Sequence, residues 1–239
     1  MRSIAGRYDD AAFDRPAVGL VVLQSDVVIE HELRRWLPAS VPLLHSRIPN
    51  DTMVSAETLG AMEARLPQAV SLLPAGIDYG VIAYGCTSAS TLVGEARVEA
   101  LVRSVLPGVA VTNPLSAAKA HLAHLGTRRI GLLAPYVPAI SQAIVDHLEN
   151  SGIRVAHAVT FDQPDDARVA RLTRASVLEA LVTLGRRDDC DAVFGSCTNL
   201  RAFDLLEEAE RLVGKPVFTS NSALAWHIRT LLDRKGKNR

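Results

Sequence analysis

Two cysteines stand in matching turns of the sequence, and a thiol in such a turn can act as a base or as a nucleophile. Cys86 lies in the segment AYGCTSAS, where a strand-like apolar run ends at a glycine and small hydroxyl residues follow. Cys197 lies in AVFGSCTNLR, which again places an apolar run, a small residue and then Cys-Thr in that order. A lone cysteine is more often a small buried hydrophobic residue, which is how we interpret Cys190. The repeat of the whole arrangement points to function.

A turn that leads from a parallel strand into a helix directs free backbone N–H groups and the helix dipole at one point. A thiolate is stabilised there, so we expect the pKa of each thiol to fall from about 8.5 towards neutrality. The same turns offer donors that can hold a carboxylate, namely Thr87, Ser88, Thr198 and Asn199. Two such turns that face each other place a thiol on each face of a small carboxylate substrate. That geometry suits proton transfer between the two faces of a carbon, or thiolate addition from one side.

The elements that position these turns alternate along the chain. We expect eight strands near Val18–Leu23, Val41–Arg47, Tyr79–Tyr84, Val109–Thr112, Arg129–Leu133, Arg154–Phe161, Ala192–Gly195 and Val217–Thr219. Amphipathic stretches predict helices at Val28–Leu37, Ala56–Leu72, Thr91–Val105, Ser116–Leu125, Ala139–Asn150, Ala175–Leu184, Leu200–Val213 and Ala223–Leu232. This alternation predicts an α/β fold with parallel sheets.

The eight strand–helix units divide into two sets of four, and each motif cysteine follows the third strand of its set. A (β/α)8 barrel has the same number of units and is the competing fold. Such a barrel typically uses about 250 residues, which is tight for a chain of 239 with an N-terminal arm. We therefore predict two parallel-sheet lobes related by a pseudo-twofold axis.

Composition excludes several classes of partner and cofactor. Lysine plus arginine (26) equals aspartate plus glutamate (26), so no net field favours nucleic acid or an anionic membrane. No apolar stretch approaches the roughly 20 residues that a membrane span needs. The charged N-terminus is unlike a signal peptide, and three cysteines favour a reducing, cytoplasmic location. We expect no metal and no cofactor, because neither metal-ligand spacing nor a glycine-rich phosphate loop is present.

The segments YGCTSAS and SCTNLR resemble the aspartate/glutamate racemase superfamily, and within it the maleate isomerase-like branch. That branch includes maleate cis–trans isomerases, arylmalonate decarboxylases and proteins associated with ectoine utilisation. Supporting stretches run along most of the chain: VGLVVLQSDVVIE, HLGTRRIGLLAPY and PVFTSNSALAWH.

The resemblance implies two flavodoxin-like lobes with a cofactor-free active site between them. The N-terminal lobe would comprise residues 1–114 plus 216–239, because the last strand and helix return to it, and residues 115–215 would form the C-terminal lobe. Cys86 and Cys197 inherit the roles of catalytic thiols, and Tyr136 in the APY segment that of a substrate-orienting residue. Arylmalonate decarboxylases keep only the second cysteine, so the presence of both argues for an isomerase or a racemase.

Two positions depart from the maleate isomerase pattern. That group typically has a Ser-Asn pair after the first strand, where this chain has Ser25-Asp26. It also has an asparagine shortly after the tyrosine, where this chain has Ser141. Asparagine amides would donate to a substrate carboxylate, whereas Asp26 would repel one and would suit an ammonium group. We include Ser25, Asp26 and Ser141 among the substrate-binding residues, and these departures argue against maleate itself.

The leading hypothesis is a cofactor-independent racemase or cis–trans isomerase of a small carboxylate. A bilobed carboxylate-binding or sensing protein without turnover is the main alternative, and it would leave both thiols dispensable. A decarboxylase of the arylmalonate type and a redox switch that pairs the two thiols are further alternatives. The substrate identity and any homo-oligomer stay open at this point.

Overall fold

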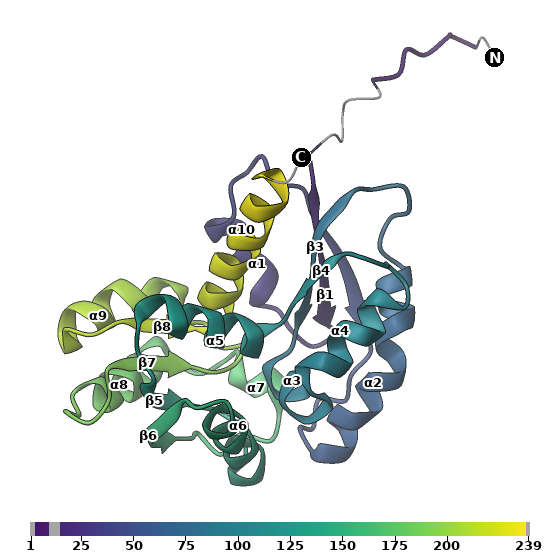
Figure 1. The fold of residues 1–239 in the computed structure, drawn as a ribbon. Helices are drawn as coiled ribbons and strands as arrows, with labels where there is room; N and C mark the ends of the chain where they lie inside the picture. The colour runs from purple at the N-terminus through teal and green to yellow at the C-terminus, as the bar shows by residue number, and fades with distance from the viewer. Residues whose placement is uncertain (1–2, 10–14, 238–239) are drawn as a thin grey trace.

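The computed structural model describes residues 3–9 and 15–237 of the chain. It contains two four-stranded parallel sheets, each covered by helices on its faces (Figure 1). The first sheet has the order β2-β1-β3-β4 and the second has the order β6-β5-β7-β8. The two orders are the same, so the prediction of two related lobes is confirmed, and the single barrel is wrong.

The first sheet is built from β1 (Ala17–Leu23), β2 (Leu43–Ile48), β3 (Tyr79–Gly85) and β4 (Ala110–Thr112). The strands β1 and β3 lie in the middle and are buried at every position, which explains why they read as unbroken apolar runs. The helices of this lobe are α1 (Ile29–Trp36), α2 (Ala56–Ser71), α3 (Thr87–Val93) and α4 (Glu95–Arg103).

The second sheet is built from β5 (Arg129–Leu133), β6 (Arg154–Val159), β7 (Ala192–Gly195) and β8 (Val217–Thr219). Its central strand β7 ends two residues before Cys197, and β3 of the first sheet ends one residue before Cys86. The helices here are α5 (Pro114–Leu125), α6 (Pro138–Asn150), α7 (Asp166–Val169), α8 (Arg174–Gly185) and α9 (Leu206–Val213). The two cysteines thus occupy equivalent ends of equivalent strands.

The C-terminal segment is shared between the sheets. Strand β8 pairs with β7 of the second sheet, Val217 opposite Val193, so the expectation that the chain returns to the first lobe at Pro216 is wrong for this strand. The last helix, α10 (Ser220–Lys237), packs most extensively against α5, and it also packs against α1 and β3 of the first lobe (Figure 1). Near its end Lys235 donates to Asp78 and to the carbonyl of Tyr79. We propose that α10 belongs with the first lobe and that β8 stays with the second.

Two helices differ from their predicted bounds near the cysteines. The single helix expected over Thr91–Val105 is two helices that meet at Gly94, whose φ of 85° favours glycine. The helix expected from Leu200 begins only at Leu206, after a 3-10 turn, η1 (Phe203–Leu205). Cys86 therefore caps a helix directly, whereas Cys197 is followed by an irregular turn. Within the described part of the chain, no helix is long and apolar enough to cross a membrane.

Candidate active site

Both motif cysteines are buried where the two lobes meet. Each thiol is only 2% exposed. The Sγ of Cys86 accepts a hydrogen bond from the backbone N–H of Ala89 (3.4 Å), and the Sγ of Cys197 accepts one from the N–H of Asn199 (3.3 Å). Across this interface between the two lobes, which we call the seam, the hydroxyl of Thr198 donates to the carbonyl of Gly85 (3.4 Å). These contacts join the two cysteine turns into one site.

The expectation of acidic thiols is wrong for this conformation. Burial raises the pKa of Cys86 to about 12, and the hydrogen bonds from Ala89 and Ser88 lower it only in part. Burial raises the pKa of Cys197 well above its ordinary value, and the charge of Asp166 adds to the shift. The sequence argument counted the turn N–H groups and omitted the cost of removing a thiolate from water. Both groups are therefore neutral thiols at neutral pH in the closed site.

Tyr136 lies against the second thiol, and its predicted role in orienting a substrate stays a prediction. Its hydrogen bond to Cys197 lowers the pKa of that thiol and so favours the thiolate, although burial outweighs it. Burial also raises the pKa of Tyr136 well above its ordinary value, with the charges of Cys197 and Cys86 adding to the shift. The tyrosine hydroxyl thus stays a donor, within electrostatic reach of both thiols.

Asp26 reaches the site from the start of α1 and is 1% exposed. Its Oδ1 accepts from the backbone N–H groups of Val28 (2.8 Å) and Ile29 (3.0 Å), so it fixes the turn that leads into α1. Its Oδ2 has no hydrogen bond of normal geometry to any described residue. Burial raises the pKa of Asp26 to about 6, against the lowering by those N–H groups and by the nearby Thr198 hydroxyl.

Asp166, at the start of α7, is a site residue that the sequence analysis missed. It is buried, and its Oδ2 accepts from the hydroxyl of Ser25 (2.6 Å) and from the amide of Asn199 (3.0 Å). Burial raises its pKa, and its charge raises the pKa of both thiols. No sequence signal separates it from its neighbour Asp165, because both are acidic residues in the turn PDDAR and only the fold buries the second.

Several predicted donors to substrate are used by the protein itself. The Oδ1 of Asn199 accepts from the N–H of Val27 (3.1 Å), while its Nδ2 donates to Asp166. The hydroxyl of Ser25 is held between Asn50 and Asp166. Ser25 and Asn199 therefore orient Asp166, and their contact with a substrate stays a prediction.

The side chains of the remaining predicted residues contact a thiol, another hydroxyl or the backbone. The hydroxyl of Ser88 lies 3.6 Å from the Sγ of Cys86, and that of Thr87 lies 2.9 Å from the hydroxyl of Ser220. The hydroxyl of Ser141 donates to the carbonyls of Tyr136 (3.0 Å) and Ala134 (3.3 Å). Ser141 thus stabilises the turn that carries Tyr136, and its predicted contact with a substrate stays a prediction.

Two segments from opposite lobes pair with each other at Asp166. Met53 forms an antiparallel bridge with Asp165, and Val54 donates its N–H to the carbonyl of Pro164 (2.8 Å). A return bond joins the N–H of Asp166 to the carbonyl of Thr52 (3.0 Å). The backbone position of Asp166 in the site is therefore fixed by a segment of the first lobe.

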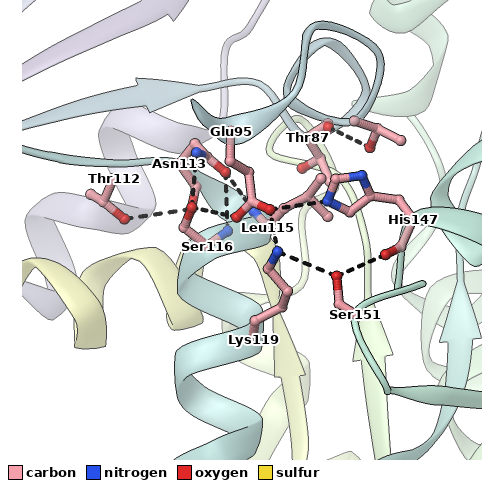
Figure 2. A network of polar contacts seen from close by, with 10 residues as sticks. Thr87, Glu95, Thr112, Asn113, Leu115, Ser116, Lys119, His147 and Ser151 are labelled. Carbon is pink, nitrogen blue, oxygen red and sulfur yellow. Dashed lines mark hydrogen bonds and ion pairs between the residues drawn. The ribbon is translucent and has the colours of Figure 1, made fainter. Parts of the chain in front are cut away.

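A polar network centred on Glu95 ties the helices behind Cys86 to the second lobe (Figure 2). The carboxylate of Glu95 accepts from Ser116 (2.5 Å), from Lys119 and from His147 (3.0 Å). Burial alone would raise the pKa of Glu95, but the hydrogen bonds from His147, Lys119 and Ser116 lower it to about 2. The network therefore joins α4, α5 and α6, and α4 follows directly after the helix that Cys86 caps.

We expect Glu95→Gln to lower the free energy of unfolding at pH 7 by about 1–2 kcal/mol, after allowance for solvent screening. Since the pKa of Glu95 is depressed in the folded state, this stabilisation is present above the ordinary value of 4.5 and is lost as pH falls towards 2. Urea unfolding of both proteins between pH 7 and pH 4 measures the difference. Glu99→Gln on the same helix, which breaks the exposed pair with Arg103, is the control and should cost about 0.5 kcal/mol or less. Equal costs for the two variants would contradict the prediction.

Comparison with known proteins agrees with this geometry. The chain is 29% identical over 226 residues to a maleate isomerase of Nocardia farcinica (strain IFM 10152), covering 90% of each chain. It is 23% identical over 214 residues to an arylmalonate decarboxylase of Bordetella bronchiseptica, covering 88% of each. Among solved structures, it resembles a cysteine-to-serine variant of Nocardia farcinica maleate cis–trans isomerase with a covalently bound succinylcysteine intermediate. That match has a TM-score of 0.83 and 28% identity, and covers 91% of this chain and 93% of the other.

The model of one protein family, arylmalonate decarboxylase, matches residues 52–239, which is most of the chain and includes both cysteine turns. The resemblance inferred from YGCTSAS and SCTNLR is thereby confirmed. The chain belongs to the arylmalonate decarboxylase family.

Proposed function

We propose that this protein is a cofactor-independent isomerase of a small carboxylate, in which Cys86 and Cys197 act on the same substrate from two sides. The observation that supports this most directly is the pair of free thiols buried together at the seam, each placed by an equivalent strand of its own lobe. Simple binding of a carboxylate needs no thiol. The arylmalonate decarboxylase alternative is less well supported, because the chain has a cysteine at both positions.

Two reactions need this arrangement, and both need one thiolate and one thiol. In cis–trans isomerisation, the Cys86 thiolate forms a C–S bond to one alkene carbon while Cys197 gives its proton to the other. Rotation about the resulting single bond, return of the proton to Cys197 and release of the thiolate yield the trans acid. In racemisation, one thiolate removes a proton from the α-carbon and the other thiol delivers a proton to the opposite face. The relatives named as maleate isomerases support the first route, whereas a substrate without a carbon–carbon double bond can follow only the second.

The order of events follows from the high pKa values of the closed site. Because burial disfavours either thiolate, one thiol must lose its proton to water while the site is open to solvent, before the substrate carboxylate is bound. The Tyr136 hydrogen bond to Cys197 favours the charged form of that sulfur when it forms. We also propose a cytoplasmic location, where the three free cysteines would stay reduced.

Proton NMR in deuterated water, over a panel of small acids, tests the function. The panel contains maleate, aspartate, glutamate, 2,4-diaminobutyrate with its N-acetyl forms, and arylmalonates. Conversion of a cis to a trans acid, or deuterium entry at an α-carbon with loss of optical purity, supports the isomerase. Carbon dioxide release from arylmalonates would support the decarboxylase, and saturable binding without turnover of any acid would support the sensor.

We expect Tyr136→Phe to lower turnover by about 10- to 100-fold, because it removes the hydrogen bond that favours the Cys197 thiolate. The loss should be larger at low pH than at high pH, since a higher pH restores the thiolate that the missing donor no longer favours. A pH profile of turnover for both proteins measures this. A Tyr136→Phe profile parallel to that of the unmodified protein would assign Tyr136 to packing alone.

A further inference from the structure

The proposed site contains two acidic side chains. Asp26 and Asp166 are both buried beside the thiols, and each raises the pKa of Cys86 and Cys197 through its charge. Asp166 also acts on Asp26, disfavouring its ionised form. The two carboxyl groups therefore share one small volume with the reacting sulfurs.

Asp26 has an unsatisfied oxygen in that volume. Its Oδ1 is fixed by the N–H groups of Val28 and Ile29, whereas its Oδ2 has no hydrogen bond of normal geometry to any residue in the described part of the chain, although the nearby hydroxyl of Thr198 favours its charged form. An unpartnered carboxylate oxygen is costly in a buried position, and a catalytic role or a bound ion or ligand is among the reasons for which proteins retain such groups. An N–H donor with a positive charge satisfies both the oxygen and the charge.

The cations nearest the site are directed elsewhere. Arg47 donates to the backbone carbonyls of Leu23 and Asp26 and pairs with Glu30, so it lies on the main-chain side of Asp26. Beyond Val27, a cavity of about 310 Å³ is lined by Arg35, Arg174 and Arg201, among other residues.

Each of those cavity arginines has a partner. Arg35 binds Asp204, Arg174 binds Glu208, and Arg201 donates to the carbonyl of Leu172. Within the described residues, Asp166 and Thr198 act on Asp26, and Asp26 acts on both thiols; none of these side chains carries a positive charge. A dicarboxylate dianion would meet two carboxyl groups there without a compensating base.

We propose that the substrate of this isomerase carries an ammonium group, which Asp26 and Asp166 bind while the thiols act on the carbon beside its carboxylate. The inference rests on the proposed function and narrows it to a small amino acid or diamino acid. Asp26 is the primary determinant, because its free Oδ2 accepts the ammonium directly. Asp166, oriented by Ser25 and Asn199, supplies the second charge.

Calorimetry of binding at pH 6.5, in two buffers of different ionisation enthalpy, tests the proposal without requiring turnover. The probes are aspartate, 2,4-diaminobutyrate and fumarate, the last being a dianion without an ammonium group. An ammonium favours ionised Asp26, so the amino acids should bind with release of a fraction of a proton. A dianion has the opposite effect, so any fumarate binding should take up protons.

Asp26→Asn should weaken amino-acid binding by about tenfold or more and abolish the proton release. Asp166→Asn should weaken it in the same direction, and the exposed Asp188→Asn serves as the control for loss of one acidic charge. Amino-acid binding with proton release but without turnover would support this inference while refuting the isomerase. Preferential binding of fumarate, proton uptake with the amino acids, or failure of every amino acid to bind would overturn the inference, whatever the turnover result.

Discussion

Replacement of either Cys86 or Cys197 by serine is expected to lower turnover by about 10³-fold or more, because each thiol performs a step that the other cannot. A serine hydroxyl has nearly the shape of a thiol but is a far weaker acid, so it neither forms the attacking anion nor gives up a proton at neutral pH. Both sulfurs sit in tight contacts with backbone N–H groups, and the small substitution leaves those contacts in place. The two losses should be similar in size, since one thiolate and one thiol are both needed.

The two variants should differ in what they accumulate. If Cys86 adds to the substrate, Cys197→Ser retains the nucleophile and should collect a covalent adduct on Cys86 when an unsaturated acid is supplied. Cys86→Ser should collect none. Intact-protein mass spectrometry after a brief incubation distinguishes the two, and for a racemase neither variant gains mass.

Cys190→Ser is the matched control for this experiment. Cys190 is also buried, but its thiol donates to the carbonyls of Leu184 (3.3 Å) and Arg187 (3.6 Å), at a distance from the seam, and serine can make the same bonds. We expect its turnover to stay close to that of the unmodified protein. Full activity in either Cys86→Ser or Cys197→Ser would remove the chemical basis of the proposed function.

The sequence predicted the sheets well, and for an identifiable reason. Buried central strands such as Tyr79–Gly85 are unbroken apolar runs bounded by turn residues, so their number and order can be read along the chain. The predicted lobe boundary is wrong at a place where tertiary contacts determine which sheet a strand joins. Strand Val217–Thr219 is too short to specify its own partner, and only its pairing with β7 assigns it to the second sheet.

The two cysteine turns of the site could be recognised in the sequence, but the pKa values of their thiols could not be predicted from it. The turns of Cys86 and Cys197 could be recognised because a strand end and a small-residue turn are local patterns. Asp166 could not, because its burial depends on the contact of segment 164–166 with segment 52–54 from the other lobe. Burial of the site raises the pKa values of the thiols, which a list of nearby N–H groups cannot reveal.

The free energy of unfolding of the protein should depend on pH because of the unpaired carboxyl group of Asp26. Burial raises the pKa of Asp26 from 3.8 to about 6, so the folded state holds its proton more tightly than the unfolded state. The associated stability is present below the unfolded value and is lost as pH rises through the folded one. A shift of this size corresponds to about 3 kcal/mol once the group is fully ionised.

Asp26→Asn removes this titration while keeping an oxygen that can accept from the N–H groups of Val28 and Ile29. We therefore expect the free energy of unfolding of Asp26→Asn, relative to the unmodified protein, to rise by about 2.4 kcal/mol between pH 4 and pH 7. Urea unfolding at unit steps of pH measures the difference, and the exposed Asp188→Asn is the control for the loss of one acidic side chain. A flat difference for Asp26→Asn would mean that the carboxylate is already satisfied in the free protein, which would also remove its reason to bind an ammonium group. A rise of the expected size would show that the protein tolerates a destabilising charge beside its thiols, and catalysis or substrate recognition is the reason that the site geometry supplies.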